Sequence, residues 1–273
     1  MTTEAAQAAT AHIGFAVEGG LARITIDNPA QRNAMTVAMW EQLSDTLDRV
    51  ATDNSIRAVL LTGAGERAFC AGANIDELAA AMEDPAEMRR QNTLIRDVQL
   101  QLEQLPRPTL AVIRGACYGG GCGLALACDI RLADSAATFA ITPAKLGILY
   151  SLLDTRRLVN VVGAANARDL LLTGLPVSAA RAQQIGLVQH LAEGADVEAV
   201  QGELVQSLLQ NSQYSLRWTK ATLGYLGGNG AELESGVETL QQAFDDAFSG
   251  DDFKEGSAAF LERRRPGFRW PEK

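Results

Sequence analysis

The sequence contains few of the side chains that bind metal ions or build disulfide frameworks. Only two histidines occur, His12 and His190, and the four cysteines include no Cys-x-x-Cys pair. Structural zinc sites need clustered Cys and His ligands, and disulfide frameworks are typical of small secreted domains rather than of a chain of 273 residues. We therefore expect neither a bound metal ion nor a disulfide framework.

Basic residues are too few and too scattered to hold a polyanion. The chain has 24 Lys and Arg against 33 Asp and Glu, a formal net charge of −9, and its one basic run is Arg263-Arg264-Arg265. Sequence-independent binding of nucleic acid or of an anionic lipid surface needs clustered positive charge. The composition argues against both partners.

Long apolar runs are lacking as well. Stretches such as 109–113 and 125–128 are much shorter than the roughly 20 residues that a helix needs to cross a bilayer. Residues 1–11 are small and polar, with an acidic Glu4, and lack the basic and apolar regions of a secretory signal. We expect a cytoplasmic protein with no membrane partner.

The chain does contain an alternation of short apolar strands and amphipathic helices, in a sequence whose 47% hydrophobic content supports a packed core. Residues 13–17 and 21–26 flank Glu18-Gly19-Gly20 and predict a hairpin. Further strands are predicted at 58–62, 109–113 and 130–132, and helices at 37–50, 75–82, 88–105, 124–128, 197–209, 216–226, 236–247 and 256–264. This order predicts an α/β fold with buried sheets, active residues on the loops between strand and helix, and a helical C-terminal part.

Two glycine-bearing loops, 68–73 and 116–123, each follow a predicted strand and precede a helix. Backbone N–H groups at the start of a helix have no partner within it, and glycine lets a ligand oxygen approach them. Two such donors meeting at one oxygen would stabilise an enolate or a tetrahedral oxyanion. From spacing alone, simple tight turns remain the alternative. A dinucleotide loop fits less well, because Leu124 stands where the third glycine of Gly119-x-Gly121-x-x-Gly belongs.

Four segments, in order, resemble the crotonase superfamily, the enoyl-CoA hydratase and isomerase fold. Residues 28–35, Asn-Pro-Ala-Gln-Arg-Asn-Ala-Met, are similar to its first CoA-binding loop, and 68–75, Ala-Phe-Cys-Ala-Gly-Ala-Asn-Ile, to its A-F-x-A-G-x-D-[IL] segment. Residues 114–129, with Gly119-Gly120-Gly121 and Cys128-Asp129, resemble its G-x-x-x-G-G-G-x-x-L-x-x-x-C-D signature. Residues 259–268 resemble its closing A-F-x-E-[KR]-R-x-P-x-F.

The resemblance implies a fold, a substrate class and an assembly. It implies a spiral core of β-β-α units over residues 1–200, which holds the acyl-CoA site, and a helical trimerisation region over 201–273, in a homotrimer or homohexamer. An acyl-CoA thioester is the implied substrate, and no cofactor is expected because CoA is part of that substrate.

The resemblance also assigns site residues. It places the two oxyanion-hole N–H groups on Ala73 and Gly120 and puts Tyr150 beside the reacting group. The residues expected to contact the substrate are Arg32, Ala71, Asn74, Ile75, Gly119, Thr142 and Arg263, the last from a neighbouring subunit.

Two catalytic carboxylates of the family's hydratases are missing from the positions that correspond to them, which hold Gly123 and Pro143. Hydration needs one group to activate water and another to protonate the α-carbon, and neither Gly nor Pro serves. The segment 139–150 instead resembles a branch that decarboxylates malonyl-type CoA thioesters, with Tyr150 beside the substrate carboxylate. We therefore expect a non-hydratase reaction such as decarboxylation. A hydratase or isomerase with a non-standard acid/base, or an inactive CoA-thioester binder, remains the alternative.

Two further polar residues lie near these positions. Lys145 is interpreted as a surface lysine. Asp154, which precedes Thr155, is interpreted as the N-cap of a helix, with a catalytic role as the alternative.

Overall fold

A computed structural model describes residues 11–229 and 236–269. The strands are β1 (His12–Glu18), β2 (Leu21–Asp27), β3 (Ala58–Gly63), β4 (Ala68–Cys70), β5 (Thr109–Ile113), β6 (Ala116–Tyr118), β7 (Ile130–Asp134), β8 (Thr138–Ala140), β9 (Val177–Ser178) and β10 (His190–Ala192). The helices are α1 (Val37–Thr52), α2 (Ile75–Ala81), α3 (Pro85–Gln104), α4 (Gly120–Ala127), α5 (Leu152–Thr173), α6 (Ala179–Gln184), α7 (Asp196–Gln210), α8 (Gln213–Gly224), α9 (Val237–Ala247) and α10 (Asp251–Glu262). Short turns of helix occur at η1 (Pro29–Gln31), η2 (Pro143–Leu146) and η3 (Tyr225–Asn229).

The strands form two sheets, and the chain passes from one to the other at each turn of the fold. The larger sheet has the order β1-β2-β3-β5-β7-β10 and the smaller one β4-β6-β8-β9. Among the strand pairs of the described residues, only β1–β2 and β8–β9 are antiparallel. Because β3, β5 and β7 each lead into a three-residue strand of the smaller sheet, the chain winds as a spiral of β-β-α units. The predicted α/β class and the predicted hairpin are confirmed.

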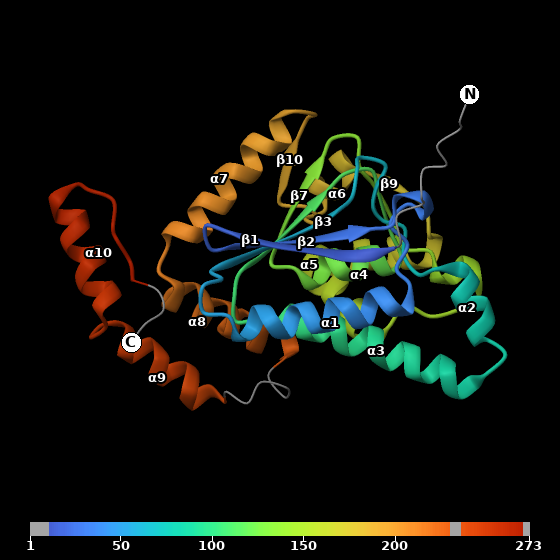
Figure 1. Cartoon of the computed structure of the whole chain (residues 1–273), viewed down its shortest axis with the longest axis horizontal. Helices are drawn as coiled ribbons and strands as arrows, with labels where there is room; N and C mark the ends of the chain where they lie inside the picture. Colours follow the sequence, from blue (N-terminus) through green and yellow to red (C-terminus); the bar gives the residue numbers. More distant parts are fainter. Residues whose placement is uncertain (1–10, 230–235, 270–273) are drawn as a thin grey trace, which may run out of the picture.

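Helices cover the larger sheet on both faces, as Figure 1 shows. Successive side chains of a strand point to opposite faces, and on β3 Val59 and Leu61 join the main core with α1 and α3. Leu60 faces the other way and packs with Val197 of α7. All three β3 side chains are fully buried, so the strand reads as a continuous apolar run.

The prediction of a helix over 124–128 places its start four residues too late. Helix α4 begins at Gly120, inside the triplet that the sequence pattern treats as a tight connection. Gly119 supplies the turn, with φ 50° and ψ −115°, a conformation that side-chain-bearing residues rarely adopt. The early start brings the first N–H groups of α4 to the end of β6.

The C-terminal helices are tied to the spiral through Asp129. Its Oδ2 accepts hydrogen bonds from the Thr109 N–H at 2.7 Å, the Thr109 hydroxyl at 2.8 Å and Lys220 Nζ of α8 at 2.8 Å. Thr109 is fully buried and its hydroxyl oxygen also accepts from the Asp129 N–H. One carboxylate therefore joins the start of β5, the end of α4 and a helix of the C-terminal part.

Replacing Thr109 by Val removes the hydroxyl and leaves the Asp129 N–H without its acceptor. Loss of a partner for a buried polar group costs about 1–3 kcal/mol, so we expect the free energy of unfolding in urea to fall by that amount. Thr222→Val is the matched control, since its hydroxyl donates to the Trp218 carbonyl on the exposed side of α8. Equal losses in both variants would contradict the role given to Thr109.

Candidate active site

In the first glycine loop the Ala73 N–H has no acceptor among the described residues, whereas the N–H groups of Gly72 and Asn74 on either side of it are bonded. Met35 bonds across to this loop, donating its N–H to the Gly72 carbonyl at 2.8 Å and accepting from the Asn74 N–H at 2.9 Å. Because alternate N–H groups of an extended segment point in opposite directions, the Ala73 N–H faces away from Met35. This is the first donor that the sequence resemblance identified.

The second donor lies at the start of α4. Gly120 is the first residue of the helix, and the first four N–H groups of a helix have no acceptor within it. The next residue, Gly121, packs so closely on β4 that a Cβ there would overlap the Cys70 carbonyl and lie 2.9 Å from Cys70 Cβ. Glycine at 121 is therefore what allows α4 to approach the other loop.

The two loops meet at Gly72. This residue has φ 102°, and a Cβ there would lie 3.2 Å from the Tyr118 carbonyl oxygen and 3.4 Å from the Gly120 nitrogen. Strands β4 and β6 pair in parallel just before the two loops, which aligns their ends. The Ala73 and Gly120 N–H groups thus lie on neighbouring segments at one edge of the smaller sheet, where two donors and a helix N-terminus favour a negative charge on an oxygen.

A third loop, residues 28–35, is fixed against the first by two asparagines. Asn33 is buried, has φ 58°, and donates through Nδ2 to the carbonyls of Ala64 at 3.0 Å and Ala68 at 2.7 Å. Its Oδ1 accepts from the Asn28 N–H at 3.0 Å. Asn33 is not among the predicted contact residues, although an Asn in a Pro-containing loop is a signal for a left-handed turn.

Arg32 also lies in this loop and has an exposed side chain, with φ 53°. Its carbonyl accepts from the Ala71 N–H at 3.0 Å, so the predicted residues 32 and 71 are neighbours. Asn74 caps α2 and donates through Nδ2 to Gln31 Oε1 at 2.6 Å. Ile75, at the start of α2, is exposed.

Two predicted contact residues lie outside this group of loops. Thr142 follows β8 and is the residue before η2. Arg263 ends α10, which Figure 1 places at the opposite end of the molecule from α2. Within one chain, Arg263 therefore does not join the loops that carry Ala73 and Gly120.

Tyr150 reaches toward the start of α4. Its hydroxyl lies 3.4 Å from the Gly119 carbonyl oxygen. Burial, followed by the nearby Asp154 carboxylate, raises the pKa of the phenol well above its ordinary value. Tyr150 therefore stays protonated and offers a hydrogen-bond donor rather than a base beside the second glycine loop.

The prediction that Asp154 is the N-cap of this helix is wrong. Ser151 is the N-cap of α5, and its hydroxyl oxygen accepts from the Asp154 N–H at 2.9 Å. Asp154 occupies the third position of the helix and is only 5% exposed. The Ser-x-x-acid spacing over 151–154 is a capping signal that the sequence contains. Lys145 is exposed, as predicted.

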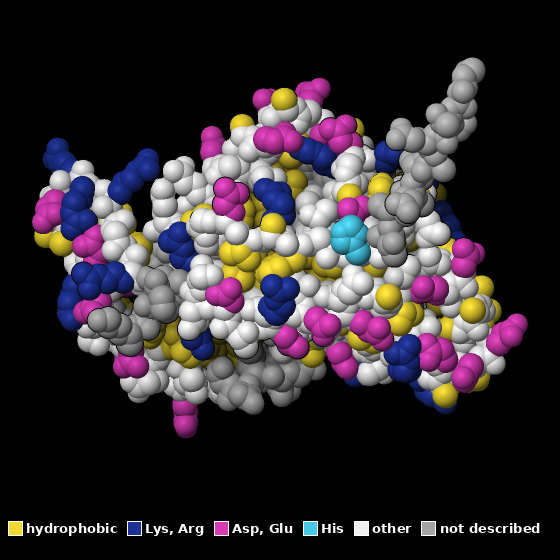
Figure 2. Space-filling view, in the orientation of Figure 1, with side chains coloured by type: hydrophobic (Ala, Val, Ile, Leu, Met, Phe, Trp, Pro, Cys, Tyr) yellow, Lys and Arg dark blue, Asp and Glu magenta, His cyan; other side chains and the backbone are white. Residues whose placement is uncertain are grey.

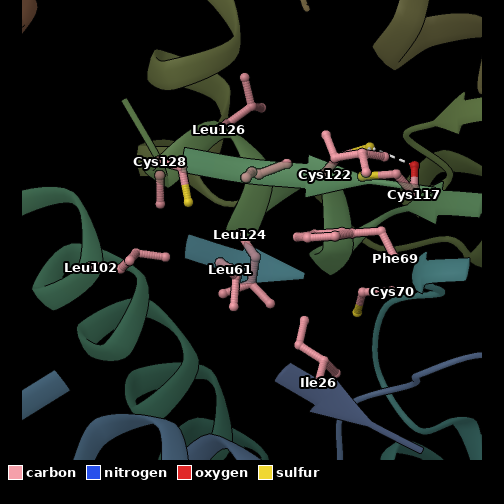
Figure 3. Packing of buried hydrophobic residues seen from close by; sticks show 14 of the residues in the cluster. Ile26, Leu61, Phe69, Cys70, Leu102, Cys117, Cys122, Leu124, Leu126 and Cys128 are labelled. Carbon is pink, nitrogen blue, oxygen red and sulfur yellow. Dashed lines mark hydrogen bonds between the residues drawn. The ribbon is translucent and has the colours of Figure 1, made fainter. Parts of the chain in front are cut away.

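The cysteines near the site are part of the packing. Figure 3 shows Cys70, Cys117 and Cys122 among apolar side chains such as Phe69, and all four cysteines of the chain are free and buried. Burial raises the pKa of the Cys70 thiol to about 12, so it is not a thiolate near neutral pH. Among residues 11–229 and 236–269, no three His, Cys, Asp or Glu side chains are grouped closely enough to hold a metal ion.

On the face drawn in Figure 2, basic side chains are interspersed with acidic ones. In the described ranges, no helix combines the length and the apolar character needed to span a bilayer.

Comparisons with known proteins identify the family. The model of the enoyl-CoA hydratase/isomerase family matches residues 16–271. A short-chain-enoyl-CoA hydratase of Clostridium acetobutylicum is 32% identical over 91% of this chain and 94% of its own. A mitochondrial Delta(3,5)-Delta(2,4)-dienoyl-CoA isomerase of Dictyostelium discoideum is 34% identical over 91% and 87%. The crystal structure of an enoyl-CoA hydratase from Bacillus anthracis superimposes with a TM-score of 0.85 at 31% identity, covering 94% of this chain and 98% of that one.

The family match extends over the spiral and the C-terminal helices alike, and the solved structures share the mixed α/β architecture. The three loops that carry the resemblance lie together in the fold, since Met35 bonds to Gly72 and Asn74, and Gly72 lies against Gly120. The chain therefore belongs to the enoyl-CoA hydratase/isomerase family, the crotonase superfamily, whose members act on acyl-CoA thioesters.

Proposed function

We propose that this chain stabilises the enolate of an acyl-CoA thioester between the N–H groups of Ala73 and Gly120, and that its reaction is decarboxylation rather than hydration. The observation that carries the proposal is the meeting of the two loops at Gly72, where a Cβ would lie 3.4 Å from the Gly120 nitrogen. Two donors on one oxygen stabilise the negative charge that develops on it when an α-substituent leaves and the electron pair of the broken bond stays with the thioester.

The absence of a carboxylate at Gly123 and Pro143 supports a reaction without a water-activating base. Loss of CO2 produces the enolate by breaking a carbon–carbon bond, so no base has to remove a proton first. Tyr150 supports the same choice, because a protonated phenol beside the Gly119 carbonyl suits a neighbouring carboxylate of the substrate. Arg32, Ala71, Asn74, Ile75, Gly119 and Thr142 are proposed to hold the remainder of the acyl-CoA, and Arg263 is proposed to contact CoA from a neighbouring subunit.

Product analysis tests the reaction. Purified protein is mixed separately with methylmalonyl-CoA and crotonyl-CoA, and the products are identified by mass. We expect propionyl-CoA and CO2 from the first and no change in the second. Hydration of crotonyl-CoA would overturn the decarboxylase proposal in favour of a hydratase with another acid/base, and bound but unchanged thioesters would favour an inactive binder.

Removing one oxyanion donor tests the site itself. Gly120→Pro lacks the N–H, and proline is well tolerated at the first position of a helix. Loss of one such donor lowers kcat by about 100- to 1,000-fold in known enzymes, and we expect a loss of that size. Gly120→Ala is the matched control because it keeps the N–H, and its Cβ would lie 3.8 Å from Gly72 Cα, an ordinary contact. Similar kcat values for the two variants would contradict the assignment.

We also propose that the chain forms a homotrimer or homohexamer through its C-terminal helices. Apolar side chains on α9 and α10 are more than half exposed, namely Phe244, Phe248, Phe253, Phe260 and Leu261. Figure 1 shows these helices extending away from the sheets. Such an exposed apolar surface is typical of a protein interface.

Light scattering after size exclusion tests the assembly. We expect a mass of three or six times 29.1 kDa, and a lower mass for Leu261→Glu, which places a charge where the side chain is 80% exposed in the isolated chain. Val17→Glu on β1, also exposed, serves as the control and should keep the parent mass. A monomeric parent protein would contradict the proposal.

A further inference from the structure

The space beside Gly123 is filled by a buried carboxylate from another helix. A Cβ at Gly123 would overlap the Gln99 amide of α3 and lie 2.9 Å from Asp154 Oδ1 and 3.2 Å from Asp154 Cγ. Asp154 belongs to α5, whose first turn packs beside α4. Glycine at 123 thus does more than omit a side chain, since it leaves room for the carboxyl group of Asp154.

Asp154 is held by donors from three sides. Its Oδ2 accepts from the Ser151 hydroxyl at 2.8 Å, and its Oδ1 from Arg157 Nη1 at 3.0 Å. With its amide nitrogen turned toward the carboxylate, Gln99 donates to Oδ1 at 3.1 Å and to Oδ2 at 3.2 Å. These bonds fix the position of the carboxyl group against the face of α4.

The charge of Arg157 is shared with a second carboxylate. Arg157 donates to Glu103 Oε2 of α3 from Nε at 2.9 Å and from Nη2 at 2.6 Å, whereas it gives Asp154 a single bond. Burial raises the pKa of the Asp154 carboxyl, although Arg157 opposes the shift. A raised pKa favours the protonated form of this carboxyl, compared with a solvent-exposed aspartate.

The position of this carboxyl relative to the two N–H groups follows from helix geometry. Residues three apart on a helix lie on the same side, so Gly123 is on the side of α4 that carries Gly120. Tyr150 and Asp154 follow that side, the hydroxyl of Tyr150 lying near the Gly119 carbonyl and the carboxyl of Asp154 against Gly123. The Asp154 carboxyl and the Tyr150 hydroxyl therefore lie on the side of α4 that begins at Gly120, next to one of the two proposed oxyanion donors.

We propose that Asp154 transfers the proton to and from the α-carbon of the bound acyl-CoA, supplying from α5 the carboxyl that α4 lacks at Gly123. The proposal rests on the enolate site proposed above. When CO2 leaves, the electron pair of the broken carbon–carbon bond passes into the enolate. The protonated Asp154 then gives its proton to the α-carbon, the carbonyl re-forms, and the carboxylate regains a proton from water.

The same transfer in reverse gives a test that needs no decarboxylation. Propionyl-CoA is incubated with the protein in D2O, and deuterium at the α-carbon is measured by mass. We expect exchange with the parent protein and at least a 100-fold slower exchange with Asp154→Asn, since general acid–base catalysis contributes about 100- to 10,000-fold. Asp169→Asn, an exposed aspartate farther along α5, is the matched control and should exchange at the parent rate.

A purely structural role for Asp154 is distinguished by a second set of measurements. Glu103→Gln disturbs the ion pairs of Arg157 but leaves the carboxyl of Asp154 in place, so we expect a much smaller loss of exchange. Melting temperature and propionyl-CoA affinity are measured for each variant. If Asp154→Asn does not fold, the double variant with Arg157→Gln removes both charges of the pair and is expected to lose exchange equally.

The outcomes separate this proposal from the one on which it rests. Equal exchange by the parent and Asp154→Asn would overturn the role of Asp154 and leave the enolate site standing. Decarboxylation of methylmalonyl-CoA without any exchange of propionyl-CoA would also overturn it, because the proton would then come from elsewhere. If the parent protein shows neither exchange nor decarboxylation, the proposed enolate site is overturned, and the role of Asp154 with it.

Discussion

The contact between the loop after β4 and the first turn of α4 is the constraint on which the proposed chemistry depends. Gly121 lies against Cys70 so closely that a methyl group would overlap the Cys70 carbonyl, and Gly72 is separated from the Gly120 nitrogen by little more than the space of one missing side chain. Overpacking a tight contact costs about 1–3 kcal/mol. Gly72 and Gly121 are therefore needed because two backbone donors reach one oxygen only when the two backbone segments lie in direct contact.

The C-terminal end of α4 is held by a buried arginine. At its far end, Arg131 is 3% exposed and donates through Nη1 to the carbonyls of Ala125 at 3.2 Å and Cys128 at 2.7 Å, and through Nε to Leu187 at 2.8 Å. Burial lowers the pKa of this guanidinium because removing a positive charge from water is unfavourable. Its charge lies at the negative end of the helix dipole, and the open N–H groups lie at the positive end. A short apolar helix with satisfied carbonyls at one end is a rigid support for the donors at the other.

Much of the fold was predictable from local sequence, and the parts that were not have physical reasons. The buried strands of the larger sheet are apolar runs such as 58–62, which periodicity detects. Strands β4, β6 and β8 are three residues each, too short for any periodicity, so the alternation between two sheets came only from family resemblance. The resemblance to the family predicts the two donors at Ala73 and Gly120, in loops that the glycine pattern by itself marks only as turns. The packing of Asp154 against Gln99 and Gly123 could not be predicted, because these two residues come from other helices.

On the proposed assignment, a carboxyl group from α5 takes the place of one on α4, and this changes which reactions the site favours. Hydration needs two groups, one to activate water and one to protonate the α-carbon, whereas the group beside Gly123 is a single carboxyl. Arg157 is bonded to Glu103 and to Asp154, and burial keeps Tyr150 protonated. On the proposed assignment, one proton donor faces an enolate that two N–H groups stabilise. That set is sufficient for a reaction in which the enolate forms by loss of CO2 and ends by gaining one proton.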